Sequence, residues 1–481
     1  MPKIITDKQK VEKVLNRGVE NIYSNREALE KVLLSGKRIK LYCGFDPSAP
    51  SLHLGNAILL NKLAQFQELG HEVIFLVGDF TGMIGDPSDK LAARKKMTRQ
   101  EVLANAKNYK KQAATYLKFS GANPAKIMYN SQWSDKMTFK DLIELTSNFT
   151  VQQMIQRDMF EKRFYGEIEC PNCRHWISAK NIIDFGGKFD LDKGYSILHE
   201  KISCFKCTKK SGQRVAFDTI TAKIKPPAPI YLHEFLYPLA QGYDSVAMEV
   251  DLEIGGNDQT FNMLVGRDLI KAILGKEKFV LTMKLLADPT GKKMGKTEGN
   301  MINLDEPAEE MYGKIMSWPD EVMAIGFELC TKVPIKEVVE IYEKLKDPKT
   351  NPRDLKMKLA YEITKINHGE KKAKVAQEYF IKTVQKKEVP EEVKIMKLSA
   401  KGGSASGGEA RSMNIVDLLI KIELAVSKGE ARRLIEQGGI KIKVGAQNFV
   451  PVQDINKIID IPKDGVVIQR GKRQFVKVVL K

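Results

Sequence analysis

The sequence predicts a multidomain α/β protein whose main domain is built on a doubly wound parallel sheet. Residues 39–43 form a short β-rich run that ends at Gly44, and an apolar helical pattern follows from about Ala57. Residues 71–79 (HEVIFLVGD) predict a second buried strand. Strand, loop, helix and strand make a βαβ unit, which is typical of Rossmann-like sheets and binds its ligand at the carboxyl ends of the strands.

The remaining elements follow from changes in composition along the 481 residues, a length for which two to four domains are expected. Two C-x-x-C pairs and several glycines mark an insertion that closes with KPPAP. Amphipathic helical segments follow the second half of the sheet domain. The stretch SAKGGSASGGEARS is a flexible linker by composition. The final piece predicts two short helices followed by β-rich runs. The predicted division is 1–165 and 228–320 for the two halves of the sheet domain, 166–227 for the insertion, 321–398 for an α-helical domain, 399–412 for the linker and 413–481 for a small α+β domain.

The charge balance indicates the class of partner. The chain has 78 basic and 60 acidic residues, a net charge of +18, which favours a polyanionic partner, with nucleic acid first. A lysine-rich surface kept for solubility explains the same excess. No window reaches the roughly 18 uninterrupted apolar residues of a membrane helix, and the N-terminus has no apolar signal core, so no membrane association and a cytoplasmic location are expected.

The stretch FDPSAPSLHLGN (residues 45–56) predicts an anion site. His53 and Gly55 stand at the start of the predicted helix, where unpaired backbone N–H groups and a partial positive charge favour phosphate. Gly55 would let a flat base approach the backbone, His53 supplies a compact donor, and Asp46 could hold an amine or order the neighbouring loop. Taken alone, the same residues are explained by a helix cap and a core histidine.

A second stretch, DPTGKKMGKTEGN (residues 288–300), places Lys293, Lys296 and Thr297 in a glycine-flanked loop. Two lysines three residues apart on a mobile loop can clamp a polyphosphate and neutralise charge as pyrophosphate leaves. The alternative is a solvated basic loop.

Together these stretches resemble the two signatures of class I aminoacyl-tRNA synthetases. YCGFDPSAPSLHLGN, GMIGDPSDK, YPLAQGYDS, IGGNDQ and KMGKT occur in the order and style of the bacterial tyrosyl-tRNA synthetases, and the tail resembles their S4-like RNA-binding domain. The resemblance implies a homodimeric ligase that activates L-tyrosine with ATP and Mg²⁺, releases pyrophosphate, and passes tyrosine to the 3′-terminal ribose of tRNA(Tyr). It also implies that the α-helical domain binds the anticodon.

The resemblance carries site roles onto individual residues. Tyr42 and Asp244 match the groups that hydrogen-bond the substrate phenol, and Asp86, Tyr237 and Gln241 match those that hold its ammonium. Tyr237, Gln241 and Asp244, at i, i+4 and i+7, fit one helix face. The catalytic set is His53, Lys293, Lys296, Thr297 and Asn56, the last at a position where this family often has histidine. The ATP and adenylate set is Cys43, Gly44, Asp46, Ser48, Gly55, Gly256, Asp258, Gln259 and Lys296.

The insertion predicts a metal site. CPNC (residues 170–173) and CFKC (residues 204–207) offer Cys170, Cys173, Cys204 and Cys207, a set suited to tetrahedral Zn²⁺ in a zinc-ribbon-like module. His175 is a possible substitute ligand, and four free thiols in a surface insert are the alternative. The resembled family does not usually carry a zinc ribbon at this point, so a structural role is expected.

The tail predicts an RNA-binding surface, because SKGEARRLIEQGGIKIKV puts basic side chains on one helix face and a following strand. A charged but idle helix face is the alternative. Two rival functions stay open at this stage, a synthetase-like protein that binds structured RNA without charging it and a ligase specific for tryptophan. The predicted RNA-binding residues are Lys428, Arg432, Arg433, Lys441 and Lys443.

Overall fold

The computed structural model describes residues 2–86, 96–178, 201–211, 216–218, 224–225, 227–287, 301–347, 349–385, 394–398, 411–444, 449–462, 464–471 and 474–480. The chain forms two compact units, one of Met1–Asp305 with Glu328–Cys330 and the other of Glu306–Phe327 with Thr331–Lys481. Among the described residues, no helix is long and apolar enough to cross a membrane.

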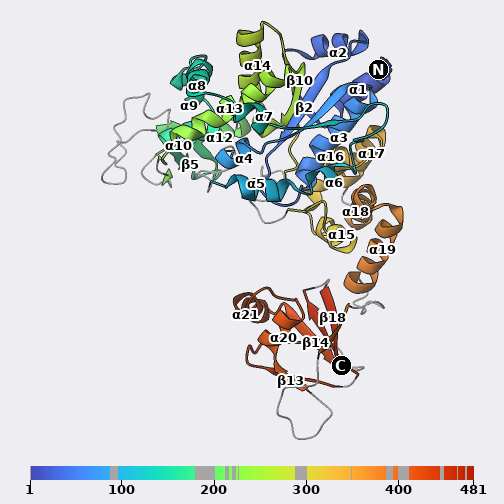
Figure 1. The fold of residues 1–481 in the computed structure, drawn as a ribbon. Coiled ribbons are helices and arrows are strands. Elements are labelled where there is room, and N and C mark those ends of the chain that lie inside the picture. The colour runs from blue at the N-terminus through green and yellow to red at the C-terminus, as the bar shows by residue number, and fades with distance from the viewer. Residues whose placement is uncertain are drawn as a thin grey trace. The chain divides into compact units, whose positions relative to one another are not determined.

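The first unit is built on a six-stranded sheet in the order β1-β11-β10-β2-β3-β4 (Figure 1). All neighbours pair in parallel except β1, which is antiparallel to β11. The crossover between β2 and β10 is a topological switch point, where open α/β sheets bind ligands at the carboxyl ends of their strands. The strands are β1 (Val19–Tyr23), β2 (Lys40–Phe45), β3 (Glu72–Val77), β4 (Lys126–Tyr129), β10 (Leu252–Gly256) and β11 (Phe279–Met283).

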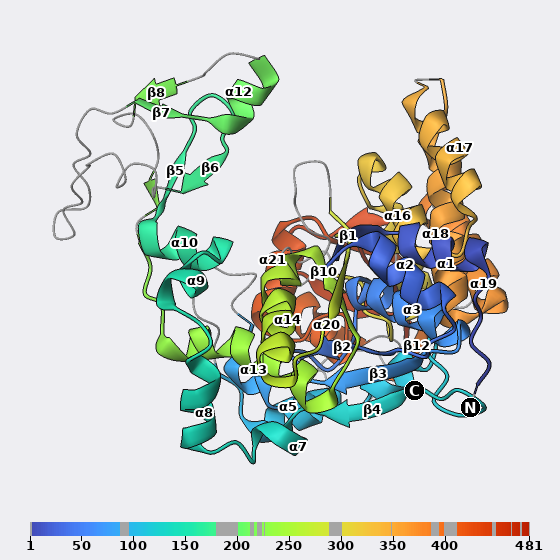
Figure 2. The same cartoon turned by 90° about the horizontal axis from the view of Figure 1, so that it is seen from above.

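Helices cover both faces of this sheet, with α3 on one side and α14 on the other (Figure 2). The predicted α/β class, parallel sheet and βαβ unit are therefore confirmed. Hydrogen-bonding side chains fix where several helices begin, for example Thr98, Thr138 and Thr150, each of which accepts a backbone N–H three residues on. The helices before the insertion are α1 (Lys8–Asn16), α2 (Arg26–Leu34), α3 (Leu54–Glu68), α4 (Thr81–Ile84), α5 (Arg99–Ala106), α6 (Tyr109–Ala113), α7 (Ser131–Ser134), α8 (Phe139–Thr146), α9 (Val151–Ile155) and α10 (Asp158–Tyr165).

After the insertion, α13 (Leu232–Met248) packs closely against α14 (Thr260–Leu274), and the turn η3 (Asn257–Gln259) precedes α14. Gly242 permits this approach, because a Cβ at this position would lie 2.9 Å from Leu269 Cδ1 and 3.1 Å from the Gly266 backbone nitrogen. The same helix α13 carries Tyr237 and Gln241, and Gln241 donates to Glu253 of β10.

The described part of the insertion contains two small sheets. β5 (Glu167–Glu169) pairs with β6 (Trp176–Ser178) and β9 (Ile224–Lys225), and β7 (Lys201–Ser203) pairs with β8 (Ala216–Asp218). The short helix α12 (Phe205–Ser211) follows β7. Arg163 of α10 ties the base of the insertion to the start of α13 through a buried ion pair with Glu234.

The second unit begins with helices and ends in a small α+β domain. Its helical elements are α15 (Ala308–Met316), η5 (Asp320–Val322), α16 (Met323–Cys330), α17 (Ile335–Lys346), α18 (Pro352–His368), α19 (Glu370–Phe380) and the π-helical turn η6 (Ile381–Gln385). The last three residues of α16, Glu328–Cys330, belong to the first unit.

The α+β domain has its own apolar core, which includes Ile415, Leu418, Ile435, Ile440 and Ile468. Its main sheet has the order β12-β18-β17-β14-β15, and β13 pairs separately with β16. The elements are β12 (Lys394–Leu398), β13 (Arg411–Asn414), α20 (Ile415–Lys421), α21 (Lys428–Glu436), β14 (Ile440–Val444), β15 (Val450–Pro451), β16 (Ile458–Ile461), β17 (Val466–Arg470) and β18 (Gln474–Leu480). Two short helices followed by strands were predicted, but β12 and β13 come before the helices. β12 lies in the range predicted as the α-helical domain (321–398), yet it pairs with β18 and so belongs to the sheet of the α+β domain.

Candidate active site

His53 lies at the start of α3, as predicted, although the helix begins at Leu54 and not near Ala57. The Asn56 side-chain oxygen accepts the backbone N–H of His53 at 3.0 Å and so caps the first turn. Gly55 is required here, because a Cβ would lie 2.9 Å from both Cε1 and Nδ1 of the His53 ring. The imidazole thus lies against the first turn of the helix, next to the backbone that was predicted to approach a ligand.

Asp46, just after β2, joins two other elements. Its Oδ1 accepts the Thr81 hydroxyl of α4 at 2.6 Å, and its Oδ2 accepts the Tyr237 hydroxyl of α13 at 2.8 Å. Gly78 makes room for this carboxylate, since a Cβ there would lie only 1.9 Å from Asp46 Oδ1 and 2.4 Å from Thr81 Oγ1. Burial, with the nearby Asp46 carboxylate, raises the pKa of Tyr237, which keeps its hydroxyl protonated as a donor.

The two residues predicted to contact a phenol, Tyr42 and Asp244, are both buried, with 1% and 2% of their surface exposed. Asp244 accepts hydrogen bonds from Trp133 Nε1 at 2.8 Å and Asn130 Nδ2 at 3.2 Å. The Tyr42 hydroxyl lies 2.9 Å from Ser245 Oγ. Burial raises the pKa of Asp244 above its usual range, an effect that the bonds from Trp133 and Asn130 partly offset.

Asp86 and Gln259 come together although 173 residues separate them, with Gln259 Nε2 donating to Asp86 Oδ2 at 2.7 Å. The buried guanidinium of Arg157 donates to the other oxygen of Asp86 at 3.2 Å and lies over the rings of Phe160 and Phe261. Asp86 therefore has a cationic partner of its own next to the residues expected to hold an ammonium group.

Gln241, on α13, is held at both ends of its amide. Its nitrogen donates to Glu253 Oε1 at 3.1 Å, and its oxygen accepts from Asn262 Nδ2 at 2.9 Å. The three groups predicted for an ammonium thus lie in one region of the sheet edge, but each is bonded there to different protein partners.

The other predicted nucleotide-binding positions surround the carboxyl ends of β2 and β10. Gly44 is exposed, and a Cβ there would meet nothing closer than Leu76 Cδ2 at 4.0 Å, so the packing of the protein does not demand a glycine. Cys43 is buried, and the Ser48 backbone N–H donates to the Asp46 carbonyl at 2.8 Å. Gly256 and Asp258 meet at the end of β10, where a Cβ on Gly256 would lie 2.4 Å from Asp258 Oδ1. Lys293, Lys296 and Thr297 lie outside the described residues.

Several residues that complete this region were missed in the sequence. Glu253 had a signal, since it is an acid within the otherwise apolar strand LEIGG, and Ser245 directly follows Asp244. The partners contributed by distant segments had no signal in the sequence, because neither a residue pattern nor a spacing links them to the site. These partners are Gly78, Thr81, Asn130, Trp133, Arg157, Asn262 and Lys278.

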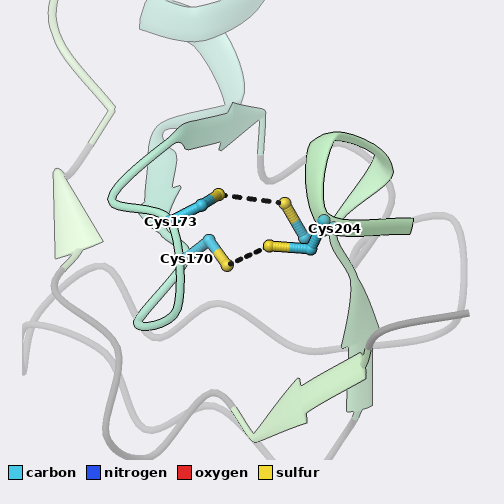
Figure 3. A group of neighbouring side chains, drawn as sticks. Cys170, Cys173 and Cys204 are labelled. Atoms are coloured by element: carbon cyan, nitrogen blue, oxygen red, sulfur yellow. Dashed lines mark hydrogen bonds between the residues drawn. The ribbon is translucent and has the colours of Figure 1, made fainter. Parts of the chain in front are cut away.

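The four cysteines of the insertion converge (Figure 3), and their sulfur atoms all lie within 4.8 Å of one another. Cys170 Sγ is 3.8 Å from Cys207 Sγ, and Cys173 Sγ is 3.5 Å from Cys204 Sγ. Four ligands at about 2.3 Å from a tetrahedral Zn²⁺ would lie about 3.8 Å apart, so the cluster fits this ion. His175 is not part of the group; its backbone carbonyl instead accepts from the Cys170 N–H at 2.8 Å.

The basic residues of the tail lie on two adjoining elements. Lys428, Arg432 and Arg433 are exposed on α21, Lys441 is exposed on β14, and Lys443 on the same strand is partly buried. Lys428 forms a surface ion pair with Asp417 at 2.9 Å, which neutralises part of its charge.

Comparisons with known proteins match nearly the whole chain to one family. The family described as tRNA synthetases class I (W and Y) matches residues 34–171 and 196–385, and the SYY-like C-terminal domain of tyrosine–tRNA ligases matches residues 398–478. The interruption at 172–195 falls within the insertion. A tyrosine–tRNA ligase of Thermotoga maritima is 39% identical over 468 residues, covering 97% of this chain and 96% of that protein. One from Haemophilus influenzae is 36% identical over 477 residues, covering 99% and 98%.

Solved structures share the fold of the first part of the chain. The C-terminally truncated mitochondrial tyrosyl-tRNA synthetase of Aspergillus nidulans has a TM-score of 0.54 at 21% identity, covering 77% of this chain and 92% of that one. The corresponding Coccidioides posadasii structure has a TM-score of 0.51 at 22% identity, covering 77% and 90%. The family matches and the near full-length identity lead to one conclusion: the chain belongs to the class I tyrosyl-tRNA synthetases.

Proposed function

We propose how this chain performs the reaction of its family, tyrosine–tRNA ligation with ATP. The carboxylate of L-tyrosine attacks the α-phosphorus of ATP, pyrophosphate leaves, and tyrosine passes from the adenylate to the 3′-terminal ribose of tRNA(Tyr). The single observation that carries the residue assignment is the burial of Tyr42 and Asp244 side by side with their own hydrogen-bonding partners at the switch point of the sheet. Buried polar groups of this kind bind a polar ligand selectively.

The phenol of tyrosine lies between Tyr42 and Asp244 in this proposal. A substrate without the hydroxyl would not supply the further hydrogen bonds that a phenol gives these two buried groups, so phenylalanine is rejected. Asp86, Tyr237 and Gln241 hold the ammonium group. The Tyr237 hydroxyl donates its proton to Asp46. The lone pairs of the Tyr237 hydroxyl oxygen are therefore left to accept from the ammonium group of the ligand.

ATP lies over Gly44, at the end of β2, and against the first turn of α3. The protein itself has room for a side chain at Gly44, so a glycine at this position is consistent with the close approach of a ligand. Cys43, Asp46, Ser48, Gly55, Gly256, Asp258 and Gln259 border the nucleotide. Mg²⁺ accompanies the phosphates of ATP and supplies positive charge. His53, the Asn56 amide nitrogen, Lys293, Lys296 and Thr297 stabilise the pentacoordinate phosphorus, so catalysis is positioning and electrostatics.

Amino-acid-dependent ATP–pyrophosphate exchange across all twenty amino acids, without tRNA, tests this function. Exchange with tyrosine alone is expected. Exchange with tryptophan instead would contradict the roles of Tyr42 and Asp244. No exchange with any amino acid, from folded protein, would favour a protein that binds RNA without charging it.

The four cysteines of the insertion hold a structural Zn²⁺ in this proposal. The sulfur spacing fits a tetrahedral ion, and the small sheets around it contain few apolar residues to hold them together. The ion takes no part in the reaction. Purified protein should contain one zinc per chain by elemental analysis, and Cys173→Ser should lose it, whereas Cys330→Ala, a change at a buried cysteine outside the cluster, should keep it.

The second unit binds tRNA in this proposal. The helices between residues 321 and 385 form the anticodon-binding domain. The S4-like domain comprises 413–481 together with β12, with the segment 399–412 between them, and its exposed basic side chains on α21 and β14 contact the RNA backbone. Changing Arg432 and Arg433 together to glutamate should weaken tRNA binding about tenfold or more and leave tyrosine-dependent exchange unchanged.

We also propose a homodimer that acts in the cytoplasm. The helices α8 and α9 and the start of α13 expose large apolar side chains, among them Phe139, Val151 and Leu232, with 78%, 66% and 83% of their surface accessible. α8, α9 and α10 follow one another along one flank of the first unit (Figure 2). An apolar flank of this kind suits a second copy of the chain.

A further inference from the structure

A buried ion pair lies behind the residues proposed to bind tyrosine. Glu253 of β10 and Lys278, just before β11, are 2% and 0% exposed and bonded to each other. The Lys278 ammonium also donates to Ser245 Oγ at 2.7 Å and to the Met263 carbonyl at 3.2 Å. All three of its N–H groups are thereby used, so the lysine is fixed in one orientation.

The second oxygen of Glu253 determines the orientation of a neighbouring amide. Because a carboxylate only accepts, Glu253 Oε1 draws the Gln241 nitrogen, at 3.1 Å, toward itself. The Gln241 oxygen must then face the other way, where Asn262 donates to it at 2.9 Å. In the described part of the chain Asn262 is its one donor, which leaves the second lone pair for a ligand. An ammonium group needs that oxygen, since the amide nitrogen would repel it.

We infer that Glu253 and Lys278 are positioning residues for substrate recognition: they lock the Gln241 amide with its oxygen toward the ammonium of the amino acid. The inference rests on the proposed role of Gln241. Lys278 matters because its ammonium determines whether residue 253 presents an oxygen or an NH₂ group to Gln241, and it does so from a fully buried position.

The pair makes an unusual prediction for a neutral residue at 253. In Glu253→Gln, the Lys278 ammonium attracts the new amide oxygen, so the new NH₂ group faces Gln241. Gln241 must then turn its own oxygen inward and its nitrogen toward the ligand. The double variant Glu253→Gln with Lys278→Met has no ammonium group to orient the new amide at position 253. This amide can then present its oxygen to Gln241 and its NH₂ group to Ser245. The original orientation then returns.

Two competitive inhibitors of tyrosine-dependent exchange isolate this effect. Tyramine carries a phenol and an ammonium, and 4-ethylphenol carries the phenol alone. The ratio of the 4-ethylphenol Ki to the tyramine Ki therefore reports ammonium recognition. We expect it to fall about tenfold in Glu253→Gln, the equivalent of one lost bond to a charged group, and to return to within about twofold of wild type in the double variant. Loss of stability alone would not move this ratio.

Two further variants make every outcome informative. Glu234→Gln makes the same change at the buried Arg163–Glu234 pair, which forms no hydrogen bond with Gln241 among the described residues, and should leave the ratio unchanged. If Glu253→Gln fails to fold, Glu253→Asp keeps the charge beside Lys278 but withdraws the oxygen from Gln241, and the ratio should fall at least about threefold. An unchanged ratio in the folded residue-253 variant, or no recovery in the double variant, overturns the inference.

Gln241→Met separates this inference from the proposed function. If that change lowers the ratio while the residue-253 variants do not, Gln241 binds ammonium but Glu253 and Lys278 do not position it. If Gln241→Met leaves the ratio unchanged, the assignment of Gln241 is itself wrong.

Discussion

Gly78→Ala should disable tyrosine activation without unfolding the protein. The new methyl group would lie 1.9 Å from Asp46 Oδ1, whereas real Cβ contacts essentially never fall below 3.0 Å. The Asp46 carboxylate must therefore move by at least about 1 Å, which breaks its 2.6 Å bond from Thr81 and its 2.8 Å bond from Tyr237. The backbone at Gly78 does not require a left-handed conformation, so the damage falls on the site.

The magnitude follows from the bonds that are lost. A hydrogen bond to a charged group contributes about 1.5–3 kcal/mol, and a misplacement of about 1 Å in a reacting site costs about 100-fold in rate. We therefore expect kcat/KM for tyrosine to fall about 100-fold, or about 2.7 kcal/mol. Thr81→Val removes only one of the two bonds and should cost about tenfold.

The assay is ATP–pyrophosphate exchange at saturating ATP with varied tyrosine, alongside thermal unfolding. Gly429→Ala is the matched control, because a Cβ at this position on α21 meets nothing closer than 3.9 Å and the residue belongs to the second unit. Wild-type kcat/KM in a folded Gly78→Ala protein would refute the role given to Asp46. A smaller loss for Gly78→Ala than for Thr81→Val would refute the steric reasoning.

Three other predictions concern different parts of the chain. Gly44→Ala should raise KM for ATP about tenfold and leave the melting temperature unchanged, because the protein has room for the methyl group and the proposed nucleotide does not. Burial lowers the pKa of Lys62 from 10.5 to about 7, so above pH 7 the folded chain binds fewer protons than the unfolded chain and stability rises with pH. Between about pH 7 and 10 the free energy of unfolding of the wild-type protein should therefore rise by about 1.4 kcal/mol per pH unit from this group. Thermal unfolding across this range should show that Lys62→Met lacks the rise. Phe139→Glu should convert the proposed dimer to monomer in sedimentation experiments, whereas Val444→Glu, at a partly exposed strand position of the tail, should not.

Local patterns predicted the parallel sheet because its signals are short-range. Apolar runs bounded by glycine or histidine identified β2 and β3, and a 3.6-residue period identified the helix between them. The start of that helix was placed three residues late, because histidine is not a preferred cap and the apolar pattern becomes regular only after Asn56. The cap is formed by the Asn56 side chain, a contact that the pattern does not reveal.

The site was predictable only where its residues lie within motifs. Motifs singled out Tyr42, Asp46, His53, Tyr237, Gln241 and Asp244, whose functional roles stay predictions. Their partners come from segments far along the chain: Trp133 reaches Asp244 across 111 residues, and Thr81 reaches Asp46 across 35. No periodicity connects such pairs, because the contact depends on how the helices fold onto the sheet.

The buried charges around this site are better explained by recognition than by stability. Asp244, Glu253 and Lys278 are almost fully buried, and burial opposes the charged form of both Asp244 and Lys278. Well-packed apolar residues in the place of a buried ion pair are often neutral or stabilising. Replacing Glu253 and Lys278 together by methionine should therefore preserve or raise the melting temperature while it releases the Gln241 amide. If the ratio of the 4-ethylphenol Ki to the tyramine Ki falls while the melting temperature is kept, the ion pair serves to orient Gln241 and not to stabilise the fold. The protein then accepts a less stable arrangement at the place where it recognises its substrate.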